Sequence, residues 1–587
     1  MKKGINNKLS KYLIIIIAFV TIFINLNHHY WDNHKNVVKW DVISYYQYLP
    51  ALVHHNDLSF KFVLKDRTLL KYKFWPITTK EGILVGKTSL GMAIIYAPFY
   101  AIAEVQARMT NQSTDGFSQP YMFWLIMSAL FYLILGIVFL RKLLLLYFSD
   151  LTVTLTISLI FFATNLLYYS SMYAAMPHVY LFSLITMFIY FSIKWHTNTS
   201  YKLSIFIGIL LSLISLIRPT DAIVVIFFLF YNIKSLNDIK KNTILFLKNY
   251  KKIVLIVLLS FIFWIPQIIY WKTITGNYLF FSYGNERFFF NNPQIFNSLF
   301  SYRKGLFIYS PVLFIAFISI ILLYKKNKEL FLPIILFTLL NIYIISSWWC
   351  WWYGGTYGSR VYIDTFVFFA ISLGTLINSL LVSSKKYKFI IFPVIFLFIA
   401  HQSFQLLQYK NKAIHYESMS KASYWDSFLR LTPSDKFYSY LQPPNYETCM
   451  IDNRFDTKIK IEKTETIFIK TYNNKFLSCN IKKNRRLEAV VEHKWQWELF
   501  YINYLNNEFI TIMNFEKKII SISDNKVNIS ENKDINLTNM FKIEKINDIE
   551  LRLKDYKDKY LFINKNNKEL NFSDTCSKNG IFQFIRN

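Results

Sequence analysis

Cysteine is scarce in this 587-residue chain, and its four cysteines have no metal-ligand spacing (Cys350, Cys449, Cys479 and Cys576). The sequence therefore predicts neither a zinc site nor a disulfide framework. Acidic residues are also few, since 36 Asp and Glu stand against 66 Lys and Arg, a formal net charge of +30. The lysines lie between apolar runs, where they orient a membrane protein and meet anionic lipid. No basic face is left over for nucleic acid, which we exclude as a partner.

Hydrophobic residues make up 53% of the chain and aromatic residues 19%, whereas only 17% of the residues are charged. A soluble protein would struggle to bury so much apolar surface, and several apolar runs approach the length of a bilayer span. The N-terminus, MKKGINNKLSKYLIIIIAFVTIFINLN, has the basic start of a signal peptide but no small-residue cleavage site. We therefore expect a polytopic α-helical membrane protein whose first span is a retained signal anchor.

The basic residues predict how the chain crosses the cell (inner) membrane, because short cytoplasmic loops are rich in Lys and Arg. With the N-terminus in the cytoplasm, about eleven spans place every strongly basic short loop inside. The loop 28–118 is then outside, and its apolar stretch 89–105 is interpreted as an interfacial or re-entrant helix. The expected spans are 12–27, 121–140, 152–170, 178–194, 203–216, 220–233, 253–271, 306–324, 331–348, 360–382 and 388–407.

Beyond about residue 450 the apolar runs shorten and alternate with polar residues, as half-buried strands do. Three units repeat here, with one apolar set at Ile469, Ile510 and Leu551 and another at Phe500, Phe541 and Phe582. The pattern predicts an all-β, extracytoplasmic β-trefoil domain over 461–587, after a linker over 411–460. The repeat resembles the fascin-like trefoils, whose W-E-x-F strand is complete only in the first unit (497–500). That resemblance establishes neither actin nor carbohydrate binding.

Ionisable residues gather at the expected outer ends of the spans, where a charge is costly unless it has a partner or a ligand. Asp41 follows the first span, in the segment WDVISYYQYLP. Cations bind phosphate, aromatic rings stack on sugars, and a carboxylate can deprotonate a hydroxyl as a general base. This set predicts transfer of a sugar from a polyprenyl-phosphate-linked donor to an acceptor hydroxyl, with a carboxylate as the base. The expected substrate-binding residues are Tyr45, Tyr46, His178, Glu286, Arg303, Lys304 and Arg360.

Several segments between residues 10 and 410 resemble the GT-C superfamily of integral-membrane glycosyltransferases, in particular the protein mannosyltransferase and aminoarabinose transferase group. They are WDVISYYQYLPAL, GKTSLGMAIIYAPFYAIAE, LIRPTDAI, FSYRKGLFIYSP and YGSRVYID. The resemblance implies a transferase domain over 1–410, Asp41 as the catalytic base, and Arg303 or Arg360 as a phosphate ligand. The chain has no D-x-D or W-W-D-x-G sequence, and WWCWWYGG (348–355) lacks the acidic residue. No motif therefore supports a divalent metal, and we assign neither a metal site nor a cofactor.

Other functions stay open on the sequence alone. A flippase or transporter for lipid-linked glycans would share the many spans, but should show charges or broken helices within them and a span repeat. A non-catalytic scaffold displaying a carbohydrate- or protein-binding trefoil would tolerate loss of Asp41, which would then only cap a helix. An enzyme like the O-antigen ligases would depend on outer His and Arg. The acceptor is also open: a glycan, a lipid or a protein, with membrane lipids as further partners.

Overall fold

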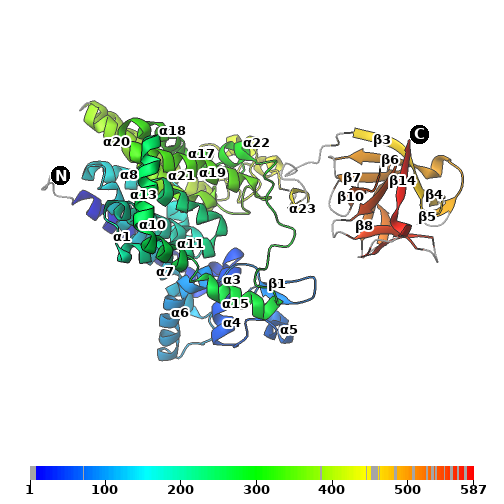
Figure 1. Cartoon of the computed structure of the whole chain (residues 1–587), viewed down its shortest axis with the longest axis horizontal. Helices are drawn as coiled ribbons and strands as arrows, with labels where there is room; N and C mark the ends of the chain where they lie inside the picture. The colour runs from blue at the N-terminus through cyan, green and yellow to red at the C-terminus, as the bar shows by residue number, and fades with distance from the viewer. Residues whose placement is uncertain are drawn as a thin grey trace. The chain divides into compact units, whose positions relative to one another are not determined.

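The chain divides into two compact units between Gln442 and Pro443, the first helical and the second all-β (Figure 1). Residues 411–442, which fall in the expected linker, belong to the first unit and include α22 (Lys421–Ser427) and η5 (Phe437–Tyr440). The computed structural model describes residues 8–70, 72–383, 386–444, 446–450, 461, 463–480, 486–505, 509–523, 526–530, 535, 539–547, 549–555, 559–564, 568–573, 575 and 578–586. Cys576 and residues 451–460 of the expected linker lie outside these ranges.

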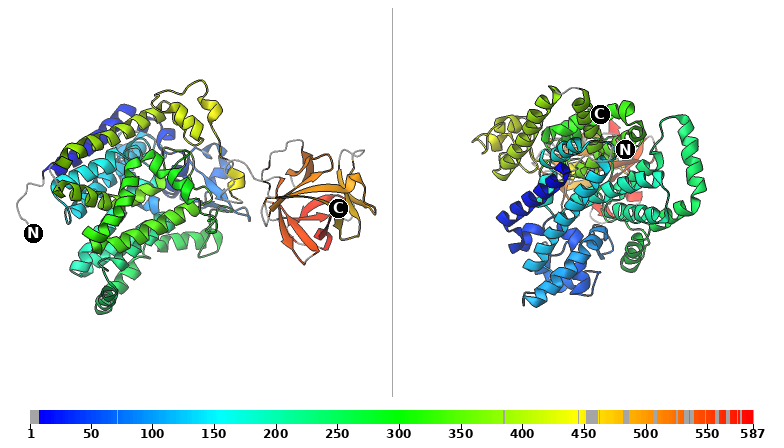
Figure 2. Two further views of the ribbon diagram at one scale, coloured as in Figure 1. Left: turned by 90° about the horizontal axis from the view of Figure 1, so that it is seen from above. Right: turned by 90° about the vertical axis from the view of Figure 1, so that its left-hand side faces the viewer.

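The long helices of the first unit run side by side as a bundle (Figure 2). Within the described residues, seven helical segments are long and apolar enough to cross a membrane. They support the expected polytopic α-helical membrane protein. The seven segments are α1 (Leu9–His28), α7 (Gln119–Leu144), α10 (Pro177–Thr197), α14 with α15 (Tyr250–Leu259 and Trp264–Thr275), α19 (Lys328–Ser347), η4 with α20 (Arg360–Thr365 and Phe366–Ser383) and α21 (Lys386–Lys410).

The four other expected spans are shorter or interrupted helices, and the number eleven stays a prediction. Two of them begin a new helix at a proline, which lacks the N–H that a continuous helix needs but suits a first turn. These spans correspond to α8 with α9 (Asp150–Phe162 and Leu166–Ser171), α11 (Tyr201–Ile217), η3 with α12 (Pro219–Val224 and Val225–Phe230) and α17 with α18 (Leu306–Tyr309 and Pro311–Lys326). The remaining helices beyond the first loop are α13 (Leu236–Lys248), α16 (Ile295–Phe300) and α23 (Tyr446–Cys449).

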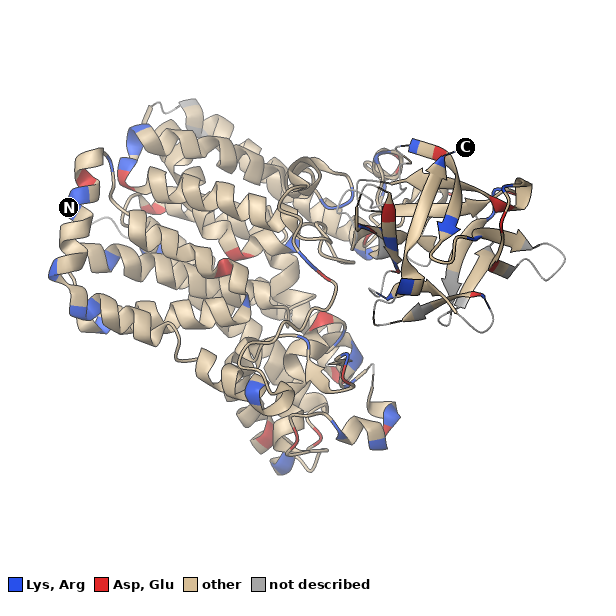
Figure 3. Ribbon diagram, turned by 45° about the vertical axis from the view of Figure 1, so that its right-hand side comes forward, with Lys and Arg blue, Asp and Glu red and all other residues tan. Residues whose placement is uncertain are grey.

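Polar contacts join the start of α1, the end of α7 and the start of α8. The buried Asp150 carboxylate accepts hydrogen bonds from the Leu9 backbone N–H at 3.0 Å and from the Ser10 hydroxyl. Arg141 Nε donates to Ser10 Oγ at 2.6 Å. All these groups belong to segments expected on the cytoplasmic side, so one end of the bundle gathers them. Figure 3 shows charged residues of the first unit at helix ends and in the connecting loops, where a charge costs less than inside a membrane.

The expected outer loop folds into short elements that lie together on one side of the first unit (Figure 1). Its longest helix, α6, covers the apolar stretch expected at 89–105 and is not among the seven membrane-length segments. Gly91, its first residue, lies so close to the backbone of Ile217 that a Cβ there would be 2.7 Å from the Ile217 nitrogen. The elements are η1 (Tyr30–Asp32), α2 (His34–Val37), α3 (Asp41–Tyr46), α4 (Tyr48–Val53), α5 (Phe62–Lys65), η2 (Arg67–Leu69), β1 (Pro76–Thr78), β2 (Leu84–Gly86) and α6 (Gly91–Met109).

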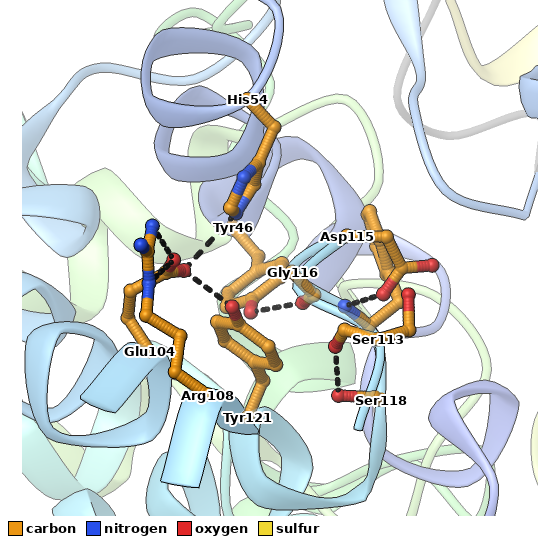
Figure 4. Close-up of polar contacts among 10 residues, drawn as sticks. Tyr46, His54, Glu104, Arg108, Ser113, Asp115, Gly116, Ser118 and Tyr121 are labelled. Carbon is orange, nitrogen blue, oxygen red and sulfur yellow. Dashed lines mark hydrogen bonds and ion pairs between the residues drawn. The ribbon is translucent and has the colours of Figure 1, made fainter. Parts of the chain in front are cut away.

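A cluster around Glu104 fastens α6 to α4 and α7 (Figure 4). The Glu104 carboxylate accepts hydrogen bonds from the Tyr121 hydroxyl and from Arg108, whose Nη2 is 2.7 Å away. His54 Nε2 lies 3.4 Å from Glu104 Oε2, the oxygen that accepts from Tyr121. Nearby, the Tyr46 hydroxyl donates to the Gly116 carbonyl at 2.5 Å. These contacts give the loop a fixed shape and direct Tyr46 into its core.

The second unit is a closed six-stranded barrel with three two-stranded hairpins. The ring runs β3–β6–β7–β10–β11–β14 and returns to β3, with antiparallel pairing at every step. The hairpins are β4–β5, β8–β9 and β12–β13. The strand bounds are β3 (Lys463–Thr471), β4 (Phe476–Asn480), β5 (Arg486–Val491), β6 (Leu499–Tyr504), β7 (Phe509–Asn514), β8 (Ile519–Ser523), β9 (Lys526–Ser530), β10 (Phe541–Lys545), β11 (Glu550–Lys554), β12 (Tyr560–Ile563), β13 (Leu570–Ser573) and β14 (Phe582–Arg586).

The repeat positions found in the sequence occupy equivalent places in this barrel. Phe500, Phe541 and Phe582 each lie at the start of a barrel strand, and their side chains are almost fully buried. The second apolar set lies in the other three barrel strands and is also buried (Ile469, Ile510 and Leu551). Alternating inward and outward residues along short strands produce this packing. The expected all-β domain is therefore present.

Candidate active site

Asp41 and Arg360 are brought together from segments 319 residues apart. Arg360 Nη2 lies 2.6 Å from Asp41 Oδ2, and the two side chains form an ion pair. The Asp41 side chain is 48% exposed, whereas that of Arg360 is only 11% exposed. The carboxylate therefore remains accessible to a substrate while a buried guanidinium holds one of its oxygens.

The backbone before Asp41 is in an unusual conformation. Trp40 has φ 51° and ψ −130°, outside the regions that a bulky side chain prefers, and Asp41 begins α3 directly after it. Strain of this kind persists only where the surrounding structure enforces it, and it is concentrated at functional sites. Here it sets the direction in which the Asp41 carboxylate leaves the loop.

A buried ion network lies behind Arg360 on η4. The Asp364 carboxylate is fully buried, and it accepts from Arg218 Nη1 at 2.5 Å and lies 2.9 Å from His178 Nδ1. Arg218 follows the end of α11, and His178 is the second residue of α10. The network therefore joins two helix ends to the short helix that carries Arg360. His178, expected to bind substrate, contacts Asp364 in this structure.

Removing Asp364 is expected to destabilise the first unit strongly. Asp364→Ala removes the buried carboxylate to which the Arg218 guanidinium donates, and breaking a buried pair costs about 3–5 kcal/mol. Thermal unfolding of the purified protein in detergent measures the effect. Asp238→Asn is the matched control, because the side-chain contacts of Asp238 are local: with Lys241, with the Ser235 hydroxyl and with the Lys234 backbone N–H. An unchanged unfolding midpoint for Asp364→Ala would contradict a structural role for the network.

Two further cations lie beside Arg360 in a buried position. Arg303 and Lys304 are 5% and 2% exposed, and Arg303 Nη1 donates to the Glu417 carbonyl at 3.2 Å. The Arg303 guanidinium also lies over the ring of Trp352, 5.3 Å from its centroid. Lys304 Nζ has no hydrogen-bond partner among the described residues. Burial lowers the pKa of Lys304, and the positive charge of Arg360 lowers it further.

A buried ammonium without a hydrogen bond is expensive, so the position of Lys304 requires an explanation. Glu417 is the acidic group whose charge acts on it, and burial raises the pKa of Glu417 as well. The Trp352 Nε1–H donates to the Glu417 carboxylate at 3.4 Å. Arg360 is already paired with Asp41, so Arg303 and Lys304 face the single carboxylate of Glu417. An anionic ligand would balance the remaining positive charge.

Tyr45 lies close to Asp41, whereas Glu286 is held by contacts of its own. Tyr45 is on α3, four residues after Asp41, so both project from the same face of that helix. Burial raises the pKa of Tyr45, and the charges of Tyr283 and Asp41 raise it further. Glu286 pairs with Lys87 and accepts a hydrogen bond from Trp349 Nε1 at 3.2 Å. Tyr45 therefore brings a hydroxyl group close to Asp41.

Sequence reasoning selected most of this cluster but missed some of its members. Glu417 fell in the expected linker, and no pattern in the sequence connects it with Lys304. Trp351 and Trp352, for which the sequence indicated no role at the site, are almost fully buried. Tyr46, expected to bind substrate, is hydrogen-bonded to Gly116 instead of reaching the Asp41 cluster (Figure 4). Within the described ranges, no group of three or more His, Cys, Asp or Glu side chains is arranged to hold a metal ion.

No family model matches the chain, and no curated protein matches its sequence. The solved structure of the S. cerevisiae protein O-mannosyltransferase Pmt1-Pmt2 complex bound to the sugar donor aligns at 9% identity and a TM-score of 0.19. That alignment covers 100% of this chain and 64% of the other, less than two thirds of its length. SeviL bound to asialo-GM1 saccharide aligns at 14% identity over 21% of this chain and 98% of its own, with a TM-score of 0.19.

The designed threefold-symmetric protein ThreeFoil aligns at 8% identity, over 21% of this chain and 99% of its own, with a TM-score of 0.19. At these identities and TM-scores, none of the three likenesses carries a conclusion about function. The chain's own residues therefore have to supply it.

Proposed function

We propose that this chain is a membrane glycosyltransferase that moves a sugar from a polyprenyl-phosphate-linked donor to an acceptor hydroxyl on the outer face of the cell membrane. The observation that carries the proposal is the half-exposed Asp41 carboxylate, paired with Arg360 at 2.6 Å beside the buried cations Arg303 and Lys304. A base next to a phosphate-binding cluster, on a bundle of membrane-length helices, suits a lipid-linked sugar phosphate.

Asp41 acts as the general base. It accepts the proton of the acceptor hydroxyl while that oxygen attacks the anomeric carbon of the donor sugar. The bond between the anomeric carbon and the phosphate oxygen breaks, and its electron pair leaves with the polyprenyl phosphate. Arg360 donates a hydrogen bond to Oδ2 of Asp41, so Oδ1 is the oxygen that takes the proton. Asp41 requires no metal for this step.

Arg303, Lys304 and Arg360 bind the donor phosphate and stabilise the charge that grows on it as the bond breaks. Guanidinium and ammonium groups prefer phosphate oxygens, and they are most effective where water is excluded. The orphaned ammonium of Lys304 would then find its partner in the donor. Tyr45 and Glu286 would contact hydroxyls of the sugar, and the lipid tail would extend along the membrane-length helices.

We further propose that the second unit is an extracytoplasmic β-trefoil. Its closed six-stranded ring, three hairpins and threefold repeat support the trefoil fold. The domain boundaries proposed here follow the two compact units, so the transferase domain ends near Gln442 and includes Glu417.

A panel of labelled polyprenyl-phosphate sugars tests the proposed function. Membranes that contain the chain should transfer at least one sugar to an endogenous acceptor, whereas membranes without it should not. Liposomes that contain the purified chain distinguish a flippase, because a flippase would move the donor across the bilayer and leave its phosphate bond intact. Donor translocation without transfer would contradict the proposal.

A further inference from the structure

Six consecutive exposed residues, Glu492–Trp497, connect β5 to the start of β6 in the second unit. Three of them carry rings. The side chain of Trp495 is 71% exposed and that of Trp497 is 39% exposed. The rings of His493 and Trp495 contact each other with centroids 4.9 Å apart. Burying a large aromatic side chain stabilises a small domain, and the exposed indole of Trp495 does not contribute in this way.

The threefold repeat provides two internal controls for this segment. The short helix η7 (Gln496–Glu498) recurs two repeats later as η9 (Lys578–Gly580), so the first and third repeats form the same turn. The positions equivalent to His493, Trp495 and Trp497 are occupied by Asp, Asn and Thr in the second repeat (534, 536 and 538) and by Thr, Ser and Asn in the third (575, 577 and 579). The fold therefore does not require an aromatic ring at any of these positions.

The backbone under the rings is fixed. The buried Glu498 carboxylate accepts a hydrogen bond from the Trp495 backbone N–H at 2.9 Å, and the Glu498 N–H donates to the Trp495 carbonyl at 3.2 Å. Lys494 turns back onto the barrel, where its ammonium lies 5.3 Å from the centroid of the Phe468 ring. The loop thus presents Trp495 to solvent without needing to be ordered by a ligand, which lowers the cost of binding.

We infer that His493, Trp495 and Trp497 form a saccharide-binding platform. One face of a pyranose ring consists of C–H groups that stack on an indole, and its hydroxyls point outward around the rim. Two polar residues of the same loop can bind such hydroxyls. The Glu492 carboxylate, 78% exposed and 3.4 Å from Lys475 Nζ, supplies acceptors, and the exposed amide of Gln496 supplies both donors and an acceptor. Three rings on one loop are a small surface, well below what a stable protein partner buries.

The platform does not depend on the proposed transfer reaction. A chain that bound a saccharide but transferred no sugar would keep this inference and lose the proposed function. If both hold, the bound saccharide is a glycan acceptor kept near the membrane for the first unit.

Binding of the purified full chain in nanodiscs to immobilised oligomers of glucose, mannose, galactose and N-acetylglucosamine tests the inference. At least one oligomer should bind, and Trp495→Ala should weaken that binding about tenfold or more. Ile549→Ala is the matched control, because Ile549 is a 67% exposed apolar side chain of the same unit. The Trp495 variant should unfold at the temperature of the wild type, since its ring is in solvent.

Three results would overturn the platform. They are the absence of binding to every oligomer, an equal loss for the Trp495 and Ile549 variants, and a Trp495→Ala defect in binding to sugar-free lipid vesicles with saccharide binding unchanged. The last would assign the indole to the membrane surface.

Discussion

Asp41→Asn is expected to lower the rate of sugar transfer about 1,000-fold, because general-base catalysis contributes on that order and an amide cannot accept the proton. Asn has the shape of Asp and can still accept the hydrogen bond from Arg360, so donor binding should change little. Transfer rates measured over a range of donor concentrations should therefore show a fall in kcat with KM nearly unchanged.

Asp32→Asn is the matched control for this prediction. Asp32 lies in the same outer loop, and its side chain is 59% exposed, similar to that of Asp41. Its replacement should leave the transfer rate as it was. If Asp41→Asn remained folded and transferred sugar within about tenfold of the wild-type rate, another group would have to take the proton.

Lys304→Met is expected to lower transfer about 100-fold and to raise the temperature at which the protein unfolds. Lys304 is 2% exposed, and its ammonium lacks a hydrogen bond while it lies near two guanidinium groups. Met keeps most of the volume of the side chain and removes the cost of burying that charge. The same change removes a ligand of the donor phosphate, worth about 100-fold in kcat/KM when the contact is made to a charged group.

The opposite signs of these two effects distinguish a ligand-binding lysine from a structural one. A lysine that stabilised the fold would give a lower unfolding temperature when replaced by Met. Lys80→Met, at an exposed position of the outer loop, should change neither quantity. A lower unfolding temperature for Lys304→Met, or full activity, would contradict a phosphate-binding role.

The helical and all-β parts could be predicted from the sequence because each depends on a local pattern. Apolar runs marked the helices, and the equivalent apolar positions such as Phe500 and Phe541 marked the barrel strands. Where a proline starts a new helix inside an expected span, as at Pro311, the continuous apolar run hid the interruption. Helix length, which decides whether a segment can span a membrane, was therefore less predictable than helix position.

The candidate site was predictable only in part, because its members meet through tertiary contacts. Asp41 and Arg360 could be selected as site residues because each is a charged residue at an expected span end. Nothing in the sequence indicated that they pair at 2.6 Å. Glu417 follows the last long helix in a segment without periodicity, so no local signal placed it beside Lys304. Tyr45 and Tyr46 are neighbours in the sequence but occupy different faces of α3. The face of Tyr45 is the one that carries Asp41, whereas Tyr46 packs inside the loop and donates to the Gly116 carbonyl.

The anomeric configuration of the transferred sugar distinguishes a general base from a nucleophile at Asp41. A base that activates the acceptor hydroxyl allows a single displacement, and this displacement inverts the configuration at the anomeric carbon. NMR of the glycosylated product and of the donor measures both configurations. With Asp41 as the base, donor and product should have opposite configurations. The same configuration in both would make Asp41 a nucleophile that forms a covalent intermediate, and would contradict its role as the base.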